Sequence, residues 1–212
     1  MAYKKSIETK KKILDAAYKL FEEKGYEKTN IKDIAKESGI VHSSIYYYFD
    51  NKENIARTMF DIKVELIKEK VLELRKSEDD ILVEILVNYI MIFKNVALNR
   101  ATREVYYNFV NYSEYDKDNI IRVKNSFFFG IELLFKQYNV DISDKDMIAY
   151  IVTSDAFAKA LFKSIINGVL EYNLYEAMEY FCEHIIISNI PISSEECKKK
   201  LDRAFELCEQ IQ

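Results

Sequence analysis

The chain has 212 residues, a formal net charge of −4 and 49% hydrophobic residues, which is the composition of a soluble globular protein. Only four glycines and one proline interrupt it. An all-β sandwich or barrel needs turn residues at intervals of roughly 8–12 positions. The shortage of turn residues excludes that class and leaves long helices.

The charge is divided unevenly along the chain. Residues 1–76 contain 17 Lys and Arg against 13 Asp and Glu, a balance of +4, which leaves −8 for residues 77–212. A basic N-terminal third on an acidic body is compatible with one end of the molecule meeting a polyanion.

Apolar residues recur with the spacing of one helix face from the first residues onward. Gly25 and Gly39 stand where the first two helices are expected to end. Six pairs have the spacing of a capped helix start. These pairs are Asn30 with Asp33, Asp50 with Glu53, Ser77 with Asp80, Ser143 with Asp146, Asn173 with Glu176, and Ser193 with Glu196.

The pattern predicts an all-α fold of about nine to ten helices. A three-helix N-terminal domain is expected over residues 1–50, and a larger helical bundle over 51–212 begins with a connecting helix at 52–76. The predicted helices cover residues 6–24, 31–38, 42–48, 52–76, 79–98, 101–112, 118–138, 144–170, 174–190 and 194–210.

No stretch of the sequence resembles a membrane span or a secretion leader. The most apolar run, residues 81–93, contains Glu84 and Asn88, so we expect no transmembrane helix. The first residues are charged and lack the apolar region of a signal peptide, so we expect a cytoplasmic protein.

Residues 31–50 have the spacing of a helix-turn-helix. With Ile31 as the first position, small Ala35 is fifth, Gly39 is ninth and apolar Ile45 is fifteenth. Those positions need, in turn, a close helix crossing, a residue tolerant of positive φ and a residue that seats the second helix. The alternative is a helical hairpin that only packs. The small shared core is expected to contain Ile34, Ile40 and Phe49.

The second helix of this pair is rich in hydroxyl groups and rings. It reads His-Ser-Ser-Ile-Tyr-Tyr-Tyr over residues 42–48, and Lys52 follows it. A buried helix of this length would need aliphatic residues, whereas a helix in a DNA major groove needs hydrogen-bonding groups for base edges and phosphates.

Residues 29–35, 39–41, 45–49 and 51–53 closely resemble the DNA-binding region of TetR-type transcriptional regulators, and the resemblance extends over residues 9–56. It implies phosphate contacts by one set of residues: Asn30, Lys32, Ser44, Tyr46 and Lys52. It places His42, Ser43 and Tyr47 nearest the base edges, with Tyr48 able to do either. His42 could instead be a solvated surface residue. Ser43 departs from the small apolar residue common in the family, so base preference cannot be transferred.

The rest of the chain is rich in aromatic residues, which could line a ligand pocket or form ordinary core. The residues assigned to a pocket are Tyr89, Phe93, Tyr106, Tyr107, Asn108, Tyr112, Phe127 and Tyr150. The resemblance further implies a homodimer held by two helices within 153–188. The residues assigned to that interface are Phe157, Leu161, Ile165, Tyr180, Phe181 and Ile185.

The sequence contains no nucleophile motif and no glycine-rich phosphate loop, so we expect no enzyme, no catalytic residue and no cofactor. The cysteines follow no zinc or disulfide spacing, and no metal site is expected. The resemblance implies a dimeric DNA-binding regulator: a repressor that a small molecule, bound in the C-terminal domain, releases from a palindromic operator. The alternative is a DNA-binding protein controlled by a protein partner. The three cysteines are Cys182, Cys197 and Cys208.

Overall fold

The computed structural model describes residues 2–74, 80–107 and 130–211, and every regular element within them is a helix. The chain divides into two compact units. The first comprises residues 1–63 and 95–112, and the second comprises 64–94 and 113–212. The all-α fold predicted from the sequence is confirmed for the described residues.

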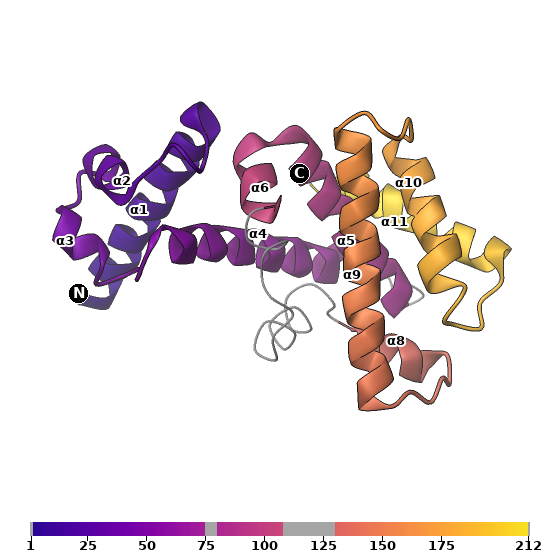
Figure 1. Cartoon of the computed structure of the whole chain (residues 1–212). Helices are drawn as coiled ribbons and strands as arrows, with labels where there is room; N and C mark the ends of the chain where they lie inside the picture. The colour runs from indigo at the N-terminus through magenta and orange to yellow at the C-terminus, as the bar shows by residue number, and fades with distance from the viewer. Residues whose placement is uncertain (1, 75–79, 108–129, 212) are drawn as a thin grey trace. The chain divides into compact units, whose positions relative to one another are not determined.

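The first unit begins with α1 (Ala2–Lys24), α2 (Ile31–Ser38) and the short α3 (His42–Ile45). One face of α1 carries Ile13, Ala17 and Phe21, which are fully buried and form the core on which α2 packs. Figure 1 shows the three helices grouped together. This packing follows from the 3.6-residue periodicity of the apolar positions.

The first unit also contains α6 (Arg100–Val105), which the predicted boundary at residue 50 would exclude. The carboxylate of Glu22 accepts a hydrogen bond from the Ala101 N–H, and the carboxylate of Glu104 accepts one from the Tyr26 N–H. Gly25, with φ +91°, makes this approach possible, because a Cβ there would lie 2.7 Å from the Arg100 guanidinium. The compact unit is therefore larger than a three-helix domain.

Two long helices, α4 (Lys52–Leu74) and α5 (Ile81–Leu98), contribute residues to both units. By length and composition α5 could cross a membrane, with a mean hydropathy of 1.8, and this differs from the expectation that no such segment exists. Its polar residues Glu84 and Asn88 are themselves buried, and 72% of the helix is covered by the chain. That burial is typical of the central helix of a core.

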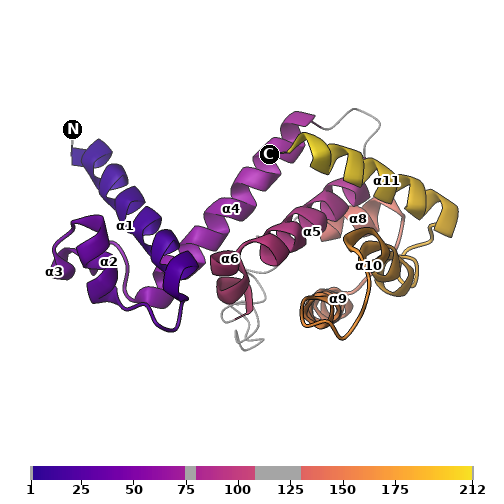
Figure 2. The same cartoon turned by 90° about the horizontal axis from the view of Figure 1, so that it is seen from above.

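The second unit continues with α8 (Ile131–Gln137), α9 (Asp144–Ile166), α10 (Leu174–Phe181) and α11 (Ser194–Gln210). A π-helical turn, Cys182–Ile186, extends α10. α10 packs against both α9 and α11, as Figure 2 shows. The second unit therefore buries its apolar side chains among packed helices.

Four of the predicted helix starts are confirmed, because Asn30, Ser143, Asn173 and Ser193 each accept the backbone N–H three residues later. Two predicted starts were displaced. The side chain of Asn51, not Asp50, caps α4 through the Asn54 N–H at 2.7 Å. The carboxylate of Asp80 caps α5 through the N–H groups of Leu82 and Val83, and Ser77 lies outside the described residues.

Several predicted helices are longer than the helices observed. The helix predicted over 42–48 ends at Ile45 and continues as turns, and the one predicted over 174–190 changes from α to π geometry after Phe181. The helix predicted over 144–170 ends at Ile166. Those predicted over 101–112 and 118–138 lie partly outside the described residues, and α6 and α8 are their described parts.

Candidate nucleic-acid interface

The geometry of the α2–α3 pair is fixed by caps at both ends of α2. The Asn30 side chain accepts the Asp33 N–H at 2.9 Å, and the Asp33 carboxylate accepts the Asn30 N–H at 3.1 Å. At the other end Gly39 has φ +68°, and its N–H bonds to the Ala35 carbonyl. This left-handed residue turns the chain from α2 into α3, as the spacing predicted.

A small apolar core joins the two helices. Ile34 and Ile45 are fully buried, and Ala35 and Phe49 are nearly so. Ile40 was also expected here but is only partly buried. The turn and the core together hold α3 at one fixed position relative to α2.

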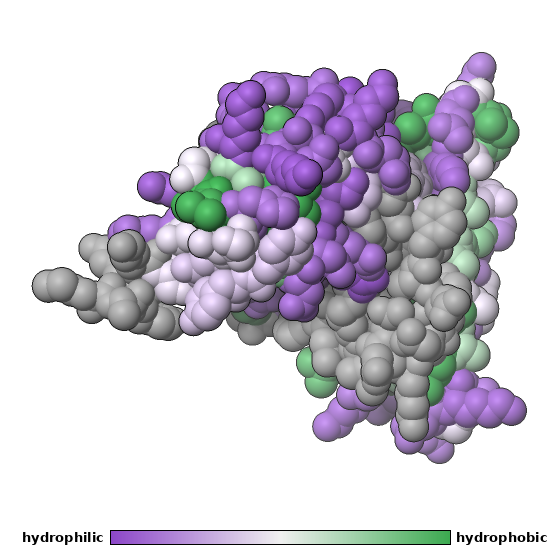
Figure 3. All heavy atoms as spheres, turned by 60° about the vertical axis from the view of Figure 1, so that its left-hand side comes forward, coloured by the Kyte–Doolittle hydropathy of each residue, from purple (hydrophilic) through white to green (hydrophobic). Residues whose placement is uncertain are grey.

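The outer side of α3 and the following turn face solvent. Val41 is 70% exposed, Tyr47 83% and Tyr46 49%, which are unusually high fractions for side chains of this size. In Figure 3, which brings this side of the molecule forward, the surface is mostly hydrophilic with a gathering of pale, near-neutral residues. Of the other residues of this segment that are predicted to contact DNA, His42, Ser43 and Ser44 are exposed and Tyr48 is partly buried.

Ring contacts order these exposed side chains. The rings of His42 and Tyr46 meet edge to face at 5.3 Å, and those of Tyr47 and Tyr48 do so at 5.1 Å. Edge-to-face packing of this kind restricts side-chain rotation. The surface therefore presents an imidazole, two serine hydroxyls and three phenols from a partly preorganised segment.

Lys52 has a role that the sequence analysis missed. Its ammonium donates hydrogen bonds to the carbonyl oxygens of Tyr26 and Thr29, both at 2.8 Å, and lies 3.8 Å from the centre of the Tyr26 ring. Partial burial lowers the pKa of the Lys52 ammonium. Two of its three N–H donors thus hold the connection between α1 and α2, and one remains for the predicted phosphate contact.

Thr29 completes this connection and was also missed. It is 1% exposed, and its hydroxyl donates to the Gly25 carbonyl at 2.8 Å. A polar residue directly before the predicted cap Asn30 was the available signal. The side-chain oxygen of Asn30 is used in the capping box, so only its amide NH₂ can donate to a phosphate.

The lysines around α2 fall into two groups. Lys24 pairs with Asp33 and Lys19 with Glu37, each at 2.6 Å. The remaining lysines form no ion pair with any described residue, so they contribute unbalanced positive charge, as a phosphate-binding surface requires. These are Lys28, Lys32 and Lys36.

Residues 13–59 match the family model described as bacterial regulatory proteins of the tetR family. The biofilm operon icaADBC HTH-type negative transcriptional regulator IcaR of Staphylococcus epidermidis is 52% identical over 48 residues. That match covers 23% of this chain and 26% of IcaR, so the chain matches about a quarter of its curated relative. Residues 13–59 of this chain therefore resemble the DNA-binding region of the tetR family.

Solved structures extend the likeness from the first residues to the whole fold. RolR in complex with resorcinol aligns with a TM-score of 0.59 at 13% identity, over 94% of this chain and 96% of RolR. A putative TetR-family regulator from Rhodococcus sp. aligns with a TM-score of 0.56 at 18% identity, over 85% and 98% of the two chains. At these identities the alignments show the fold alone.

The aromatic residues predicted to line a pocket lie in different parts of the chain. Tyr89, Phe93 and Tyr150 belong to the second unit and are buried. The Tyr89 and Phe93 rings stack at 5.9 Å, and burial strongly raises the pKa of the Tyr89 phenol. Tyr106 and Tyr107 belong to the first unit and contact each other at 5.4 Å. The remaining predicted residues, Asn108, Tyr112 and Phe127, lie outside the described residues.

The residues predicted to form a dimer interface divide by burial. Leu161 is 6% exposed and Phe181 only 1%, because both point into the core of their own unit, where Phe181 packs on Tyr89 at 4.8 Å. A partner cannot reach these two without rearrangement. The other four are partly exposed and remain accessible: Phe157, Ile165, Tyr180 and Ile185.

No group of three or more metal-ligating side chains occurs among the described residues. All three cysteines are buried free thiols. Cys182 and His184 lie two residues apart on the π-helical turn and differ in burial. The thiol is buried, and the imidazole is exposed, with its Nδ1 at 2.9 Å from the Tyr180 carbonyl oxygen.

Proposed function

We propose that the protein is a DNA-binding transcriptional regulator that reads DNA with α3 and the turn after it. The observation that carries the proposal is the exposed face of residues 42–47, set at a fixed position by the Gly39 turn. Hydroxyl, imidazole and phenol groups there can reach base edges and phosphates. The unpaired lysines around α2 supply the nonspecific attraction.

We infer that the working form is a homodimer. A single helix-turn-helix contacts few base pairs, and two-fold symmetric dimers read two half-sites about one DNA turn apart. The partly exposed residues Phe157, Ile165, Tyr180 and Ile185 on α9, α10 and the π-helical turn are the proposed contact surface. Ile185→Glu should shift the protein towards monomer in light scattering, whereas Lys199→Glu on α11 should not.

We further propose that the protein represses transcription and that a small molecule bound in the C-terminal domain relieves this repression. Two facts support it: IcaR is named a negative transcriptional regulator, and RolR was crystallised with resorcinol. A ligand shifts a regulator only if it binds the DNA-free state better than the DNA-bound state. Control by a protein partner is the second candidate, and cytoplasmic localisation follows from either.

The deciding experiment is selection of genomic DNA fragments by the purified protein at about 0.15 M salt, where specific binding exceeds nonspecific binding. A shared near-palindrome is expected. The double variant His42→Ala/Tyr47→Ala should lose the enrichment while keeping the helical content, because both side chains are exposed. Lys199→Ala is the matched surface control. Random fragments, or the same enrichment from the double variant, would overturn the proposal.

The salt dependence of DNA affinity tests the proposed lysine–phosphate contacts separately from sequence recognition. Lys32→Ala removes an exposed, unpaired charge, and should reduce the slope of affinity against salt by about one phosphate contact on every sequence. Lys52→Ala should do so too, but should also destabilise the α1–α2 connection, because it removes both carbonyl contacts. Comparing the two variants distinguishes the phosphate role of Lys52 from its structural role.

A further inference from the structure

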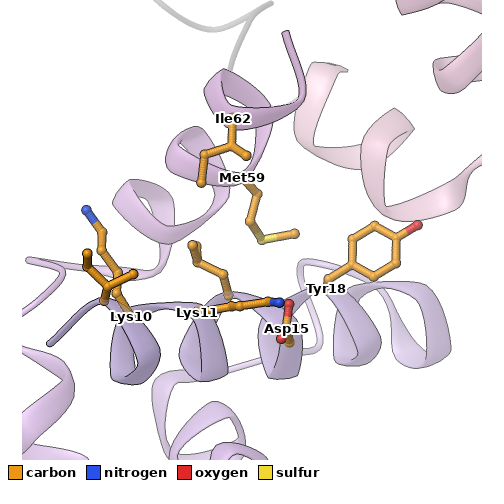
Figure 4. Close-up of a pocket in the computed structure, with 8 residues that line it drawn as sticks. Lys10, Lys11, Asp15, Tyr18, Met59 and Ile62 are labelled. Atoms are coloured by element: carbon orange, nitrogen blue, oxygen red, sulfur yellow. The ribbon is translucent and has the colours of Figure 1, made fainter. Parts of the chain in front are cut away.

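A mainly apolar groove runs between α1 and the first half of α4, within the first unit. Its volume is about 460 Å³. Figure 4 shows Met59 descending from α4 towards α1, with the ring of Tyr18 beside it. Ile7 and Ile62 line the groove although they are 53% and 45% exposed. Apolar side chains left open in this way, in a hollow of ligand size, indicate an unfilled binding surface.

A smaller hollow of about 40 Å³ shares Tyr18 and Met59 with the groove and is also lined by Lys63 and Thr102. The Lys63 ammonium donates to the Thr102 hydroxyl at 3.3 Å. No described carboxylate lies within ion-pair distance of this partly buried cation, although the Glu22 carboxylate attracts it from further away. Burial is the larger effect and lowers the pKa of the Lys63 ammonium. A cation that is partly withdrawn from water and has only a more distant carboxylate to compensate it would gain from an anion in direct contact.

We propose that this groove binds an amphiphilic carboxylate. The carboxylate group of the ligand contacts Lys63 and Thr102 in the small hollow. There the ammonium and the hydroxyl provide one donor for each carboxylate oxygen. Its apolar tail lies past Tyr18 and Met59 and extends along the groove towards Ile7. The Lys63 ammonium at one end favours an anionic group. The groove is mainly apolar, although Lys10, Lys11 and Asp15 also line it, and this favours an apolar tail over a fully polar ligand.

The consequence for regulation rests on the proposed DNA-binding function. The helices α1 and α4 support the α2–α3 pair, through α1–α2 packing and the Lys52 contacts to the α1–α2 connection. A ligand wedged between α1 and α4 would fix their separation and thereby the position of α3. This site differs from the proposed C-terminal ligand site, because every residue that lines it belongs to the first unit.

The test is calorimetric titration of the full chain with decanoate, with decanol as the uncharged analogue. Decanoate should bind and decanol should bind at least about tenfold more weakly, which is the usual effect of losing one charged hydrogen bond. Lys63→Gln should lower decanoate affinity by a similar factor. The control is Lys70→Gln, which removes an exposed lysine further along α4 that pairs with Glu73 at 2.9 Å, and it should bind as the wild type does.

A photoreactive diazirine derivative of decanoate locates the site independently of any variant. Its adducts should map by mass spectrometry to α1 and to Met59–Lys63 of α4, and Met59→Glu should abolish them. Unchanged affinity of Lys63→Gln, equal binding of decanol, or labelling confined to α9 and α10 would overturn the proposal. Because titration and labelling require no DNA, failure of operator selection leaves these results standing, and failure here leaves the proposed function intact.

Discussion

The two compact units place their polar side chains differently. In the first unit, the segment 42–47 turns hydroxyl groups and rings to solvent around the buried Ile45. In the second unit, α9 buries Ser154, Asp155 and Lys159, with Asp155 and Lys159 forming an ion pair one helical turn apart. Exposed groups are free to meet an external polar partner, whereas buried charges must find their partners within the fold. This contrast supports the proposal that the first unit contacts DNA, and it shows that α9 of the second unit satisfies its charges within the fold.

The largest expected effect comes from breaking the buried pair of the second unit. Lys159→Met should destabilise the protein by about 3–5 kcal/mol, because it removes the ammonium that pairs with the buried Asp155 carboxylate. Thermal or urea unfolding measures the change. The double variant Asp155→Leu/Lys159→Met should recover most of the loss, since two apolar residues need no counter-charge.

The exposed pair Glu195–Lys199 is the matched control for this prediction. It has the same spacing on α11, at 2.7 Å, but its side chains are 81% and 72% exposed. Lys199→Met should change stability by about 0.5 kcal/mol or less. Equal effects at the two lysines would contradict the contrast drawn between the units.

The next effect concerns the α2–α3 turn. Gly39→Val should cost about 1–3 kcal/mol, because it forces a β-branched residue to φ +68°. No described atom lies within 4 Å of the position that a Cβ would take, so the cost is backbone strain and not a clash. Asn tolerates this conformation, and Gly39→Asn should keep both stability and DNA binding. Normal DNA binding by Gly39→Val would show that the turn does not fix α3.

How far the sequence predicted the molecule differs between the units for a physical reason. The helix-turn-helix was predictable because a short turn imposes steric demands at fixed positions, and Ala35, Gly39 and Ile45 meet them as expected. The Asn30 capping box was found for the same local reason. Contacts between distant segments, such as Lys52 with the Tyr26 carbonyl, leave no periodic signal and were missed.

The second unit was predictable as helices but not as a site. Helical periodicity shows that Phe181 and Tyr180 are apolar positions, but it does not show which one faces a partner. The structure places Phe181 in the core and leaves Tyr180 partly exposed. Likewise, Glu84 interrupts the apolar run of residues 81–93 and argued against a membrane span, yet the structure buries it within α5. Packing among several helices decides which of these side chains are buried, and that packing cannot be predicted from the periodicity of a single sequence.

A smaller effect distinguishes binding from folding on the exposed face of the first unit. Tyr46→Phe removes a hydroxyl that has no hydrogen-bond partner among the described residues. Thermal stability should therefore be unchanged, while DNA affinity should fall by about 1 kcal/mol, the usual value of one hydrogen bond. Fluorescence anisotropy on the selected operator measures it. Loss of stability without loss of affinity would place Tyr46 in the fold and not at the DNA.

The smallest effect concerns the charge that supports the α2 cap. The hydrogen bond from Lys24, together with the one from the Asn30 N–H, lowers the pKa of the Asp33 carboxyl below its ordinary value of 3.8. A carboxyl with a lowered pKa stabilises the fold above its unfolded-state pKa, and that contribution is lost as the pH falls through the folded-state value. Wild type should therefore lose stability in acid more steeply than Asp33→Asn, and the two should converge below both pKa values. The group is exposed, so the difference in unfolding midpoint should be the smallest of the four. Parallel acid-unfolding curves for the two proteins would show that the Lys24–Asp33 pair contributes nothing to the position of α2.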